Sequence, residues 1–147
     1  MSAHKFLNVV ACDDVRDEVG NKKSLMGAFA GDLLVQTFPA QVQIAVYIQF
    51  QPDASRTANV LKIRLYVEDE QLIEGTMTVT PTDRPAAVVL PKGVVTFDKP
   101  STFRVTASVD DGEFEELLSF RTLPLPSISP TASAQPVLQS PTGAPST

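Results

Sequence analysis

The 147-residue chain lacks tryptophan and carries only one Cys and one His. A single Cys excludes an intramolecular disulfide framework and any metal site built from several cysteines, and a single His excludes every site that needs two. No apolar run approaches the ~18 residues of a membrane span. The net charge of −5 argues against nucleic acid, whose phosphates require clustered Lys and Arg. We therefore expect no cofactor, no nucleic acid and no membrane partner.

The N-terminal residues contain one pattern that is typical of secreted lipoproteins. Residues 9–12 read V-V-A-C, but the apolar run after Lys5 is interrupted by Asn8 and is too short for a secretory signal. We expect Cys12 to be a buried strand residue. The protein is accordingly expected in the cytoplasm, or in the virion if a phage encodes it.

The composition changes near residue 122, which predicts two regions. Residues 123–147 carry no charge and include six of the 12 prolines, with Ser, Thr and Ala between them. Proline at that density opposes helix and ladder pairing, and short polar residues bury little surface. The sequence thus predicts a folded domain over residues 1–122 and a disordered tail over 123–147. Small apolar islands make Leu123, Leu125, Val137 and Leu138 the candidate partner-binding residues, because proline-rich segments are good ligands.

The first 122 residues show the period of two that is typical of half-buried strands. It is clearest over residues 41–51, where the even positions are apolar and the odd ones are mostly polar: Val42, Ile44, Val46, Ile48 and Phe50. Further strands are predicted at residues 61–67, 73–79, 102–110 and 113–122, with Ile73 facing inward. Earlier strands are predicted at 5–13 and 24–30, and one or two more within 86–97.

Turn signals separate these runs. Asp111-Gly112 is a dipeptide that favours a two-residue type I′ hairpin turn, and the charged stretch 68–71 predicts a second hairpin. The prolines, Pro91 among them, are expected at strand boundaries. About eight short strands predict an all-β fold, an antiparallel β-sandwich of Ig-like architecture without the Ig cysteine pair and tryptophan. Its open edges could pair with a second copy, giving a homo-oligomer.

The N-terminal third resembles a known family. The similarity is carried by residues 12–27, C-D-D-V-R-D-E-V-G-N-K-K-S-L-M-G, and continues through Phe29 and Gly31-Asp32 to Phe38-Pro39. These residues look like the opening of a family of small uncharacterised bacterial and phage proteins. The similarity is strongest over residues 6–40 and excludes the tail. It implies a single β domain, and it supplies no activity and no binding residues.

Few residues are candidates for catalysis or metal binding. His4 and Cys12 would lie roughly 26 Å apart on one strand, too far for a catalytic dyad. Asp32 is expected to be a turn residue. The candidate ligands for a metal such as calcium are four acids close in sequence, which could equally form surface ion pairs with the neighbouring basic residues: Asp13, Asp14, Asp17 and Glu18.

Carbohydrate binding would need aromatic platforms, and the chain offers only Tyr47 and Tyr66, both predicted on outward faces. The sequence therefore favours a non-enzymatic structural or interaction module, with a protein partner and a place in a larger bacterial or phage assembly, docked through its tail or loops. The alternative is an ion- or small-ligand-binding β-sandwich that uses its acidic loops.

Overall fold

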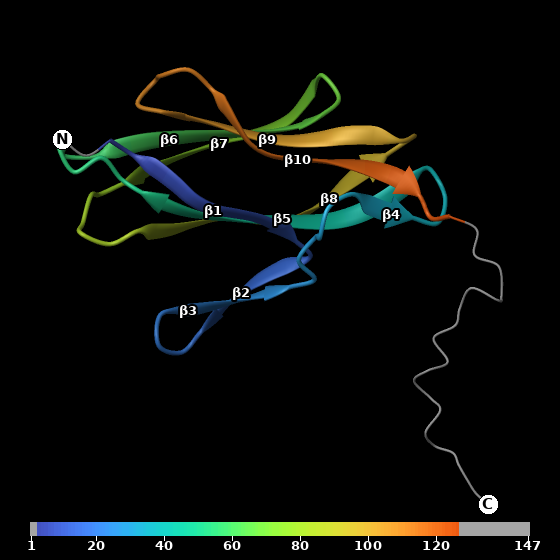
Figure 1. Cartoon of the computed structure of the whole chain (residues 1–147), viewed down its shortest axis with the longest axis horizontal. Helices are drawn as coiled ribbons and strands as arrows, with labels where there is room; N and C mark the ends of the chain where they lie inside the picture. Colours follow the sequence, from blue (N-terminus) through green and yellow to red (C-terminus); the bar gives the residue numbers. More distant parts are fainter. Residues whose placement is uncertain (1–2, 127–147) are drawn as a thin grey trace, which may run out of the picture.

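The computed structural model describes residues 3–126, which form ten strands and no helix (Figure 1). The all-β prediction is confirmed. The strands are β1 (Lys5–Cys12), β2 (Asp14–Glu18), β3 (Lys22–Met26), β4 (Leu33–Val35), β5 (Ala40–Gln51), β6 (Asn59–Val67), β7 (Glu70–Val79), β8 (Ala86–Phe97), β9 (Ser101–Val109) and β10 (Glu115–Pro124).

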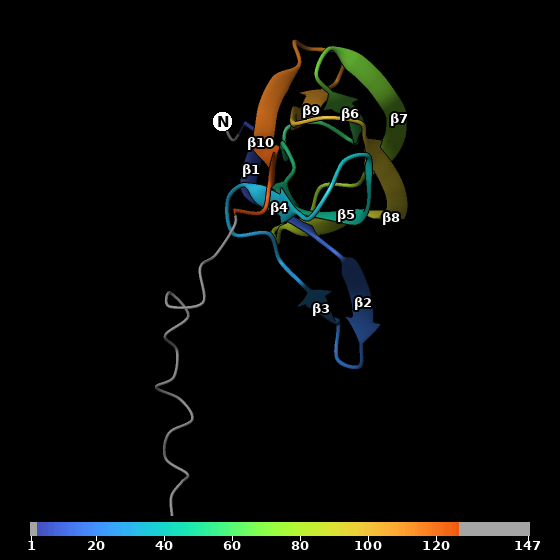
Figure 2. The ribbon, with the colours of Figure 1, turned by 90° about the vertical axis from the view of Figure 1, so that its right-hand side faces the viewer.

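Two sheets face each other over one core, as the end-on view in Figure 2 shows. One sheet has the order β1-β5-β8 and the other the order β4-β10-β9-β6-β7. All pairings are antiparallel except the short parallel pair of β4 and β10. The strands β2 and β3 form a separate two-stranded hairpin that extends away from the sandwich (Figures 1 and 2).

The core is built from the alternating apolar positions that the sequence predicts. On β5 and β6 these side chains are less than a tenth exposed: Ile44, Val46, Ile48, Phe50, Leu61, Ile63 and Leu65. At the centre Phe103 is fully buried, with its ring stacked on Phe120 at 5.0 Å and edge-on to Phe97 at 6.4 Å. Side chains from both sheets thus meet in a single layer.

The predicted hairpin turns are present, with one shifted by a residue. The β6–β7 turn lies at Glu68 and Asp69, as expected. In the β9–β10 turn the two residues with positive φ are Asp110 (53°) and Asp111 (61°), rather than Asp111 and Gly112. The reason is a tertiary contact, because the Asp110 carboxylate accepts the backbone N–H of Val60 on β6 at 2.8 Å.

Two strands and one proline differ from the prediction. The short strands β2 and β4 have no counterpart among the predicted strands. The first is largely charged and the second has only three residues, so neither shows a clear alternating pattern. Residues 86–97 form one strand, and Pro91 lies inside it instead of at a boundary. β8 is a sheet edge whose register shifts at this point, between the partners Ile44 and Val46 on β5, so the missing N–H of Pro91 breaks no ladder.

The folded region extends slightly past the predicted boundary at residue 122. Leu123 lies in β10, where it pairs with Leu34 of β4, and the Leu125 N–H donates to the Val35 carbonyl at 2.7 Å. The remaining tail, with the candidate residues Val137 and Leu138, lies outside the described residues.

Candidate functional site

The β2–β3 hairpin, hereafter the arm, is the most prominent projection of the described chain (Figure 1). Its two strands pair in register from Asp14 opposite Met26 to Glu18 opposite Lys22. A three-residue loop closes it, in which Gly20 (φ 89°) and Asn21 (φ 59°) adopt the left-handed conformation that these residue types tolerate best. Val19 at the tip is 93% exposed, which is unusual for a large apolar side chain.

Hydrogen bonds close the root of the arm and hold it against the sandwich. The Asp13 N–H donates to the Met26 carbonyl at 2.8 Å, and the Gln43 side chain on β5 donates to the Asp13 carbonyl at 2.9 Å. Cys12, immediately before, is fully buried as predicted, and its thiol donates to the Asp14 carbonyl. Burial raises the pKa of the Cys12 thiol, with a smaller contribution from nearby carboxylates. The thiol is therefore neutral and sheltered at physiological pH.

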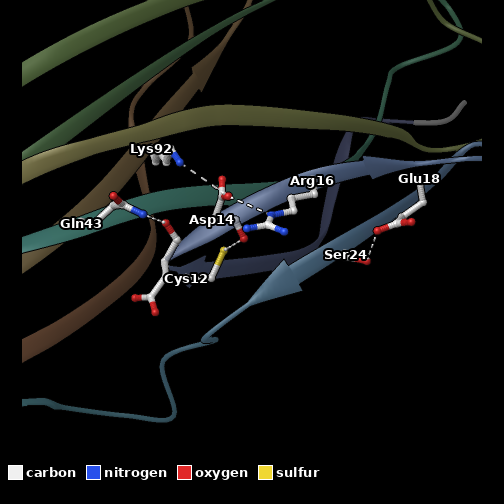
Figure 3. Close-up of polar contacts among 8 residues, drawn as sticks. Cys12, Asp14, Arg16, Glu18, Ser24, Gln43 and Lys92 are labelled. Atoms are coloured by element: carbon white, nitrogen blue, oxygen red, sulfur yellow. Dashed lines mark hydrogen bonds and ion pairs between the residues drawn. The ribbon is translucent and has the colours of Figure 1, made fainter.

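The Asp14 carboxylate joins the arm to the sandwich electrostatically (Figure 3). It pairs with Arg16 of the arm at 3.2 Å and with Lys92 of β8 at 3.7 Å. The hydrogen bond from Arg16, followed by the charge of Lys92, lowers the pKa of the Asp14 carboxyl. Asp14 therefore stays ionised and keeps both contacts across the physiological pH range.

The four predicted acids do not converge on one point. Asp17 forms an ion pair with Lys23 across the arm, and Glu18 accepts a hydrogen bond from the Ser24 hydroxyl at 2.7 Å. Asp13 packs its carboxylate against Gly27. Within residues 3–126 no group of three or more His, Cys, Asp or Glu side chains could hold a metal ion. In this arrangement Asp14, Asp17 and Glu18 serve as partners for neighbouring side chains.

A cleft lies between the arm and the outer face of the three-stranded sheet. Its volume is about 780 Å³, and its lining comes from the loop of the arm and β3, from β5, and from the start of β8 with the segment just before it. Three of its lining side chains are cationic, Lys22, Lys23 and Arg84, and none is acidic. Lys23 is paired with Asp17, whereas Lys22 and Arg84 form no ion pair with any residue that the structure describes. In an acidic chain this cleft concentrates unmatched positive charge beside the half-buried ring of Tyr47.

No sequence pattern marks this cleft, because its residues are far apart in the chain. Lys22 and Arg84 line the same cleft only because the fold brings their segments together, and neither residue belongs to a motif. Tyr47 does face outward from β5, but Tyr66 lies in the other sheet beneath the Arg104 guanidinium. The two tyrosines therefore do not form a common platform.

The remaining candidate groups, His4 and Asp32, make contacts that stabilise the fold. His4 lies next to the rings of Phe6 and Phe50, and the whole of β1 separates it from Cys12. Asp32 accepts hydrogen bonds from the Arg121 backbone N–H at 3.0 Å and from its guanidinium at 2.6 Å. Asp32 thus fastens the segment before β4 to β10.

The fold and the cleft define an all-β domain with a projecting arm and a basic recess. The chain belongs to a family of unknown function (DUF6941), whose profile matches residues 7–121. No curated protein matches the chain. The described residues include no helix long and apolar enough to cross a bilayer.

Proposed function

We propose that the protein is a non-enzymatic interaction module that binds an acidic segment of a protein partner in the cleft between the arm and the sandwich. The observation that carries this proposal is the unmatched positive charge of Lys22 and Arg84 in a recess without acidic lining. Opposite charge across an interface raises the rate of encounter and excludes like-charged competitors. The ring of Tyr47 adds an amphipathic contact surface of the kind that interfaces favour.

The arm also suits a role in assembly. Its tip exposes Val19, and its root is anchored by the hydrogen bond from Gln43 and by the ion pair of Asp14 with Lys92, so a partner would meet a pre-formed surface. A pre-formed surface loses less conformational entropy on binding. We propose that the partner belongs to a larger bacterial or phage assembly, in the cytoplasm or the virion.

The chemistry of the described residues supports a role other than catalysis. The thiol of Cys12 is buried with a raised pKa, and His4 lies at the opposite end of β1. The carboxylates of the arm are occupied by Arg16, Lys23 and other neighbours. A general acid or nucleophile requires a group that is free to reach a substrate.

The tail enters this proposal as a second point of attachment. Leu123 is part of β10, but Leu125 is 44% exposed at the point where the described chain ends. A proline-rich segment that begins there would extend the contact with a partner bound elsewhere on the domain. Open sheet edges leave pairing with a second copy as a further mode of assembly.

The test combines a defined probe with matched charge variants. A short Glu-rich peptide is titrated into the ¹⁵N-labelled protein at low salt, with NMR shifts read at Lys22, Tyr47 and Arg84. The double variant Lys22→Glu/Arg84→Glu should abolish these shifts. The control Lys5→Glu/Lys99→Glu changes the net charge equally outside the cleft and should keep them.

The same variants then serve as baits for partner capture from source cells. Proteins retained by the wild type and the control, but lost by the cleft variant, are the expected partners. If the peptide shifts spread over all cations, or if both double variants behave alike, the cleft is not the binding site.

A further inference from the structure

A second recess lies between β7 and β8, the edge strands that end the two sheets. It encloses about 420 Å³ and is lined mainly by apolar groups, with Ile44 and Leu65 at its base. We call it the edge groove. It involves residues 91–96 of β8, whereas the arm cleft involves the start of that strand.

The edge groove exists because the core is incomplete at this end. Ile73 pairs with Leu65 and faces inward as predicted, but it is 48% exposed, because the facing strand supplies no side chain to cover it. The residue opposite the inward-facing Ile44 on β8 is Gly93, and a Cβ placed there would meet nothing within 4 Å. Leu72 and Val94, at 37% and 65% exposure, extend the apolar surface along the rim.

The backbone of the edge groove is also without a partner strand. β7 ends the five-stranded sheet and β8 ends the three-stranded sheet, so each has one edge with no ladder partner in the described chain. Unpaired strand edges beside an apolar recess are a template for an added extended segment. Such a segment would supply both the missing side chain over Gly93 and hydrogen bonds to the edge.

We propose that residues 137–140 of this chain, Val-Leu-Gln-Ser, occupy the edge groove. β10 runs in the same direction as β6, so β10 ends at the end of the sandwich that carries the β6–β7 turn (Figure 1), and residues beside this turn line the edge groove. Through the strand register, Ile73 lies level with Leu118. The path from Leu125 to Ile73 is therefore three strand spacings across and about seven residues along, or about 27 Å.

The tail is long enough to cover that path. An extended proline-rich chain rises about 3.1 Å per residue, so the stretch from Leu125 to Val137 spans up to about 37 Å. Ile128, the other large apolar residue of the tail, follows Leu125 by only three residues and reaches about 10 Å. Val137 and Leu138 are thus the first pair of large apolar residues in the tail that reaches the edge groove.

The chemistry of this segment also fits. The segment carries no charge, so its burial among Leu72, Ile73 and Val94 adds no ionised group to the edge groove. It lies between Pro136 and Pro141 and contains no proline, so its backbone N–H groups are available to the strand edge. This inference needs no partner and does not rest on the charges of the arm cleft. It assigns Val137 and Leu138 to the edge groove of their own chain instead of to a partner.

Disulfide trapping in the full-length chain tests the contact directly. Gly93→Cys has room in the edge groove, and it is combined with Leu138→Cys in a Cys12→Ser background. The control joins Gly93→Cys to Ile128→Cys in the same chain. In both pairs the two cysteines lie on the same chain, so the tether alone favours neither pair. Docking of residues 137–140 should therefore make the Gly93→Cys/Leu138→Cys pair form its intramolecular disulfide about tenfold faster than the control. Equal rates, or a disulfide mainly between two chains, would overturn the proposal, and the latter would assign the edge groove to a second copy.

A second readout requires no cysteine. In methyl NMR of the full chain, Leu138→Asp should shift the Ile73 and Leu72 methyl signals, because an aspartate would leave the edge groove. The matched Ile128→Asp should leave those signals in place. If both variants move the Ile73 signal equally, or neither does, residues 137–140 do not occupy the edge groove.

Discussion

The β9–β10 turn offers a sharp test of how one side chain stabilises the fold. Asp110 binds Val60 twice, because its backbone N–H donates to the Val60 carbonyl at 2.8 Å and its carboxylate accepts the Val60 N–H at 2.8 Å. The other carboxylate oxygen pairs with Arg56 at 3.1 Å. Asp110 also has a φ of 53°, which disfavours residues with a Cβ other than Asn and Asp.

These contacts give a ranked series of variants. Asp110→Ala leaves the Val60 N–H without its acceptor, at about 1–3 kcal/mol, and adds about 1 kcal/mol of backbone strain. Asp110→Gly avoids the strain but also lacks the acceptor for the Val60 N–H, so a destabilisation of about 1–3 kcal/mol remains. Asp110→Asn keeps an acceptor and tolerates the φ, and it loses only a surface ion pair of about 0–1 kcal/mol. The expected order of destabilisation is Ala, then Gly, then Asn.

Asp111→Ala is the matched control for strain. Asp111 has a φ of 61° and pairs with Lys62, but its side chain is 81% exposed and accepts no backbone N–H. Urea unfolding followed by far-UV circular dichroism suits a chain without tryptophan, and the slope with urea should stay constant across the series. If Asp110→Ala costs no more than Asp111→Ala, the Val60 hydrogen bond does not stabilise the turn and the reasoning fails.

Three further outcomes follow from the packing and the ion pairs. Phe103→Ala removes a fully buried ring from the core and should cost about 3–5 kcal/mol in the same urea assay; a cost below about 1 kcal/mol would contradict the central position of this ring. Gly27→Ala should lower the melting temperature, because a side chain is strained at a φ of 65° and its Cβ would also displace the Asp13 carboxylate, and an unchanged melting temperature would refute this reasoning. Arg121 lowers the pKa of the Asp32 carboxyl from its usual 3.8, so this pair stabilises the fold above about pH 4 and the effect is lost as the pH falls further. Asp32→Asn should therefore be less stable than the wild type at pH 7 but not at pH 2, as thermal melts at the two pH values would show.

The period of two in the sequence correctly predicted the class of fold and much of the core. Alternation over β5 and β6 predicts which face is buried, because in a strand successive side chains point to opposite faces. The positions of the β6–β7 and β9–β10 hairpins follow from local turn chemistry in the same way. The burial of Cys12 also followed from its apolar neighbours on β1.

The features on which the proposed function depends arise from contacts between segments that are distant in the chain. The turn at Asp110 moved by one residue because of Val60, which is fifty positions away in the chain. The arm is held against the sandwich by the ion pair of Asp14 with Lys92, and the cleft is lined by both Lys22 and Arg84. Neither arrangement could be inferred from the spacing of these residues in the sequence. The alternation predicted the direction of Ile73 correctly but not its exposure, because burial depends on what the facing strand supplies, and β8 supplies a glycine. Local patterns thus set the direction of each side chain, and only the packing of distant segments decides what it meets.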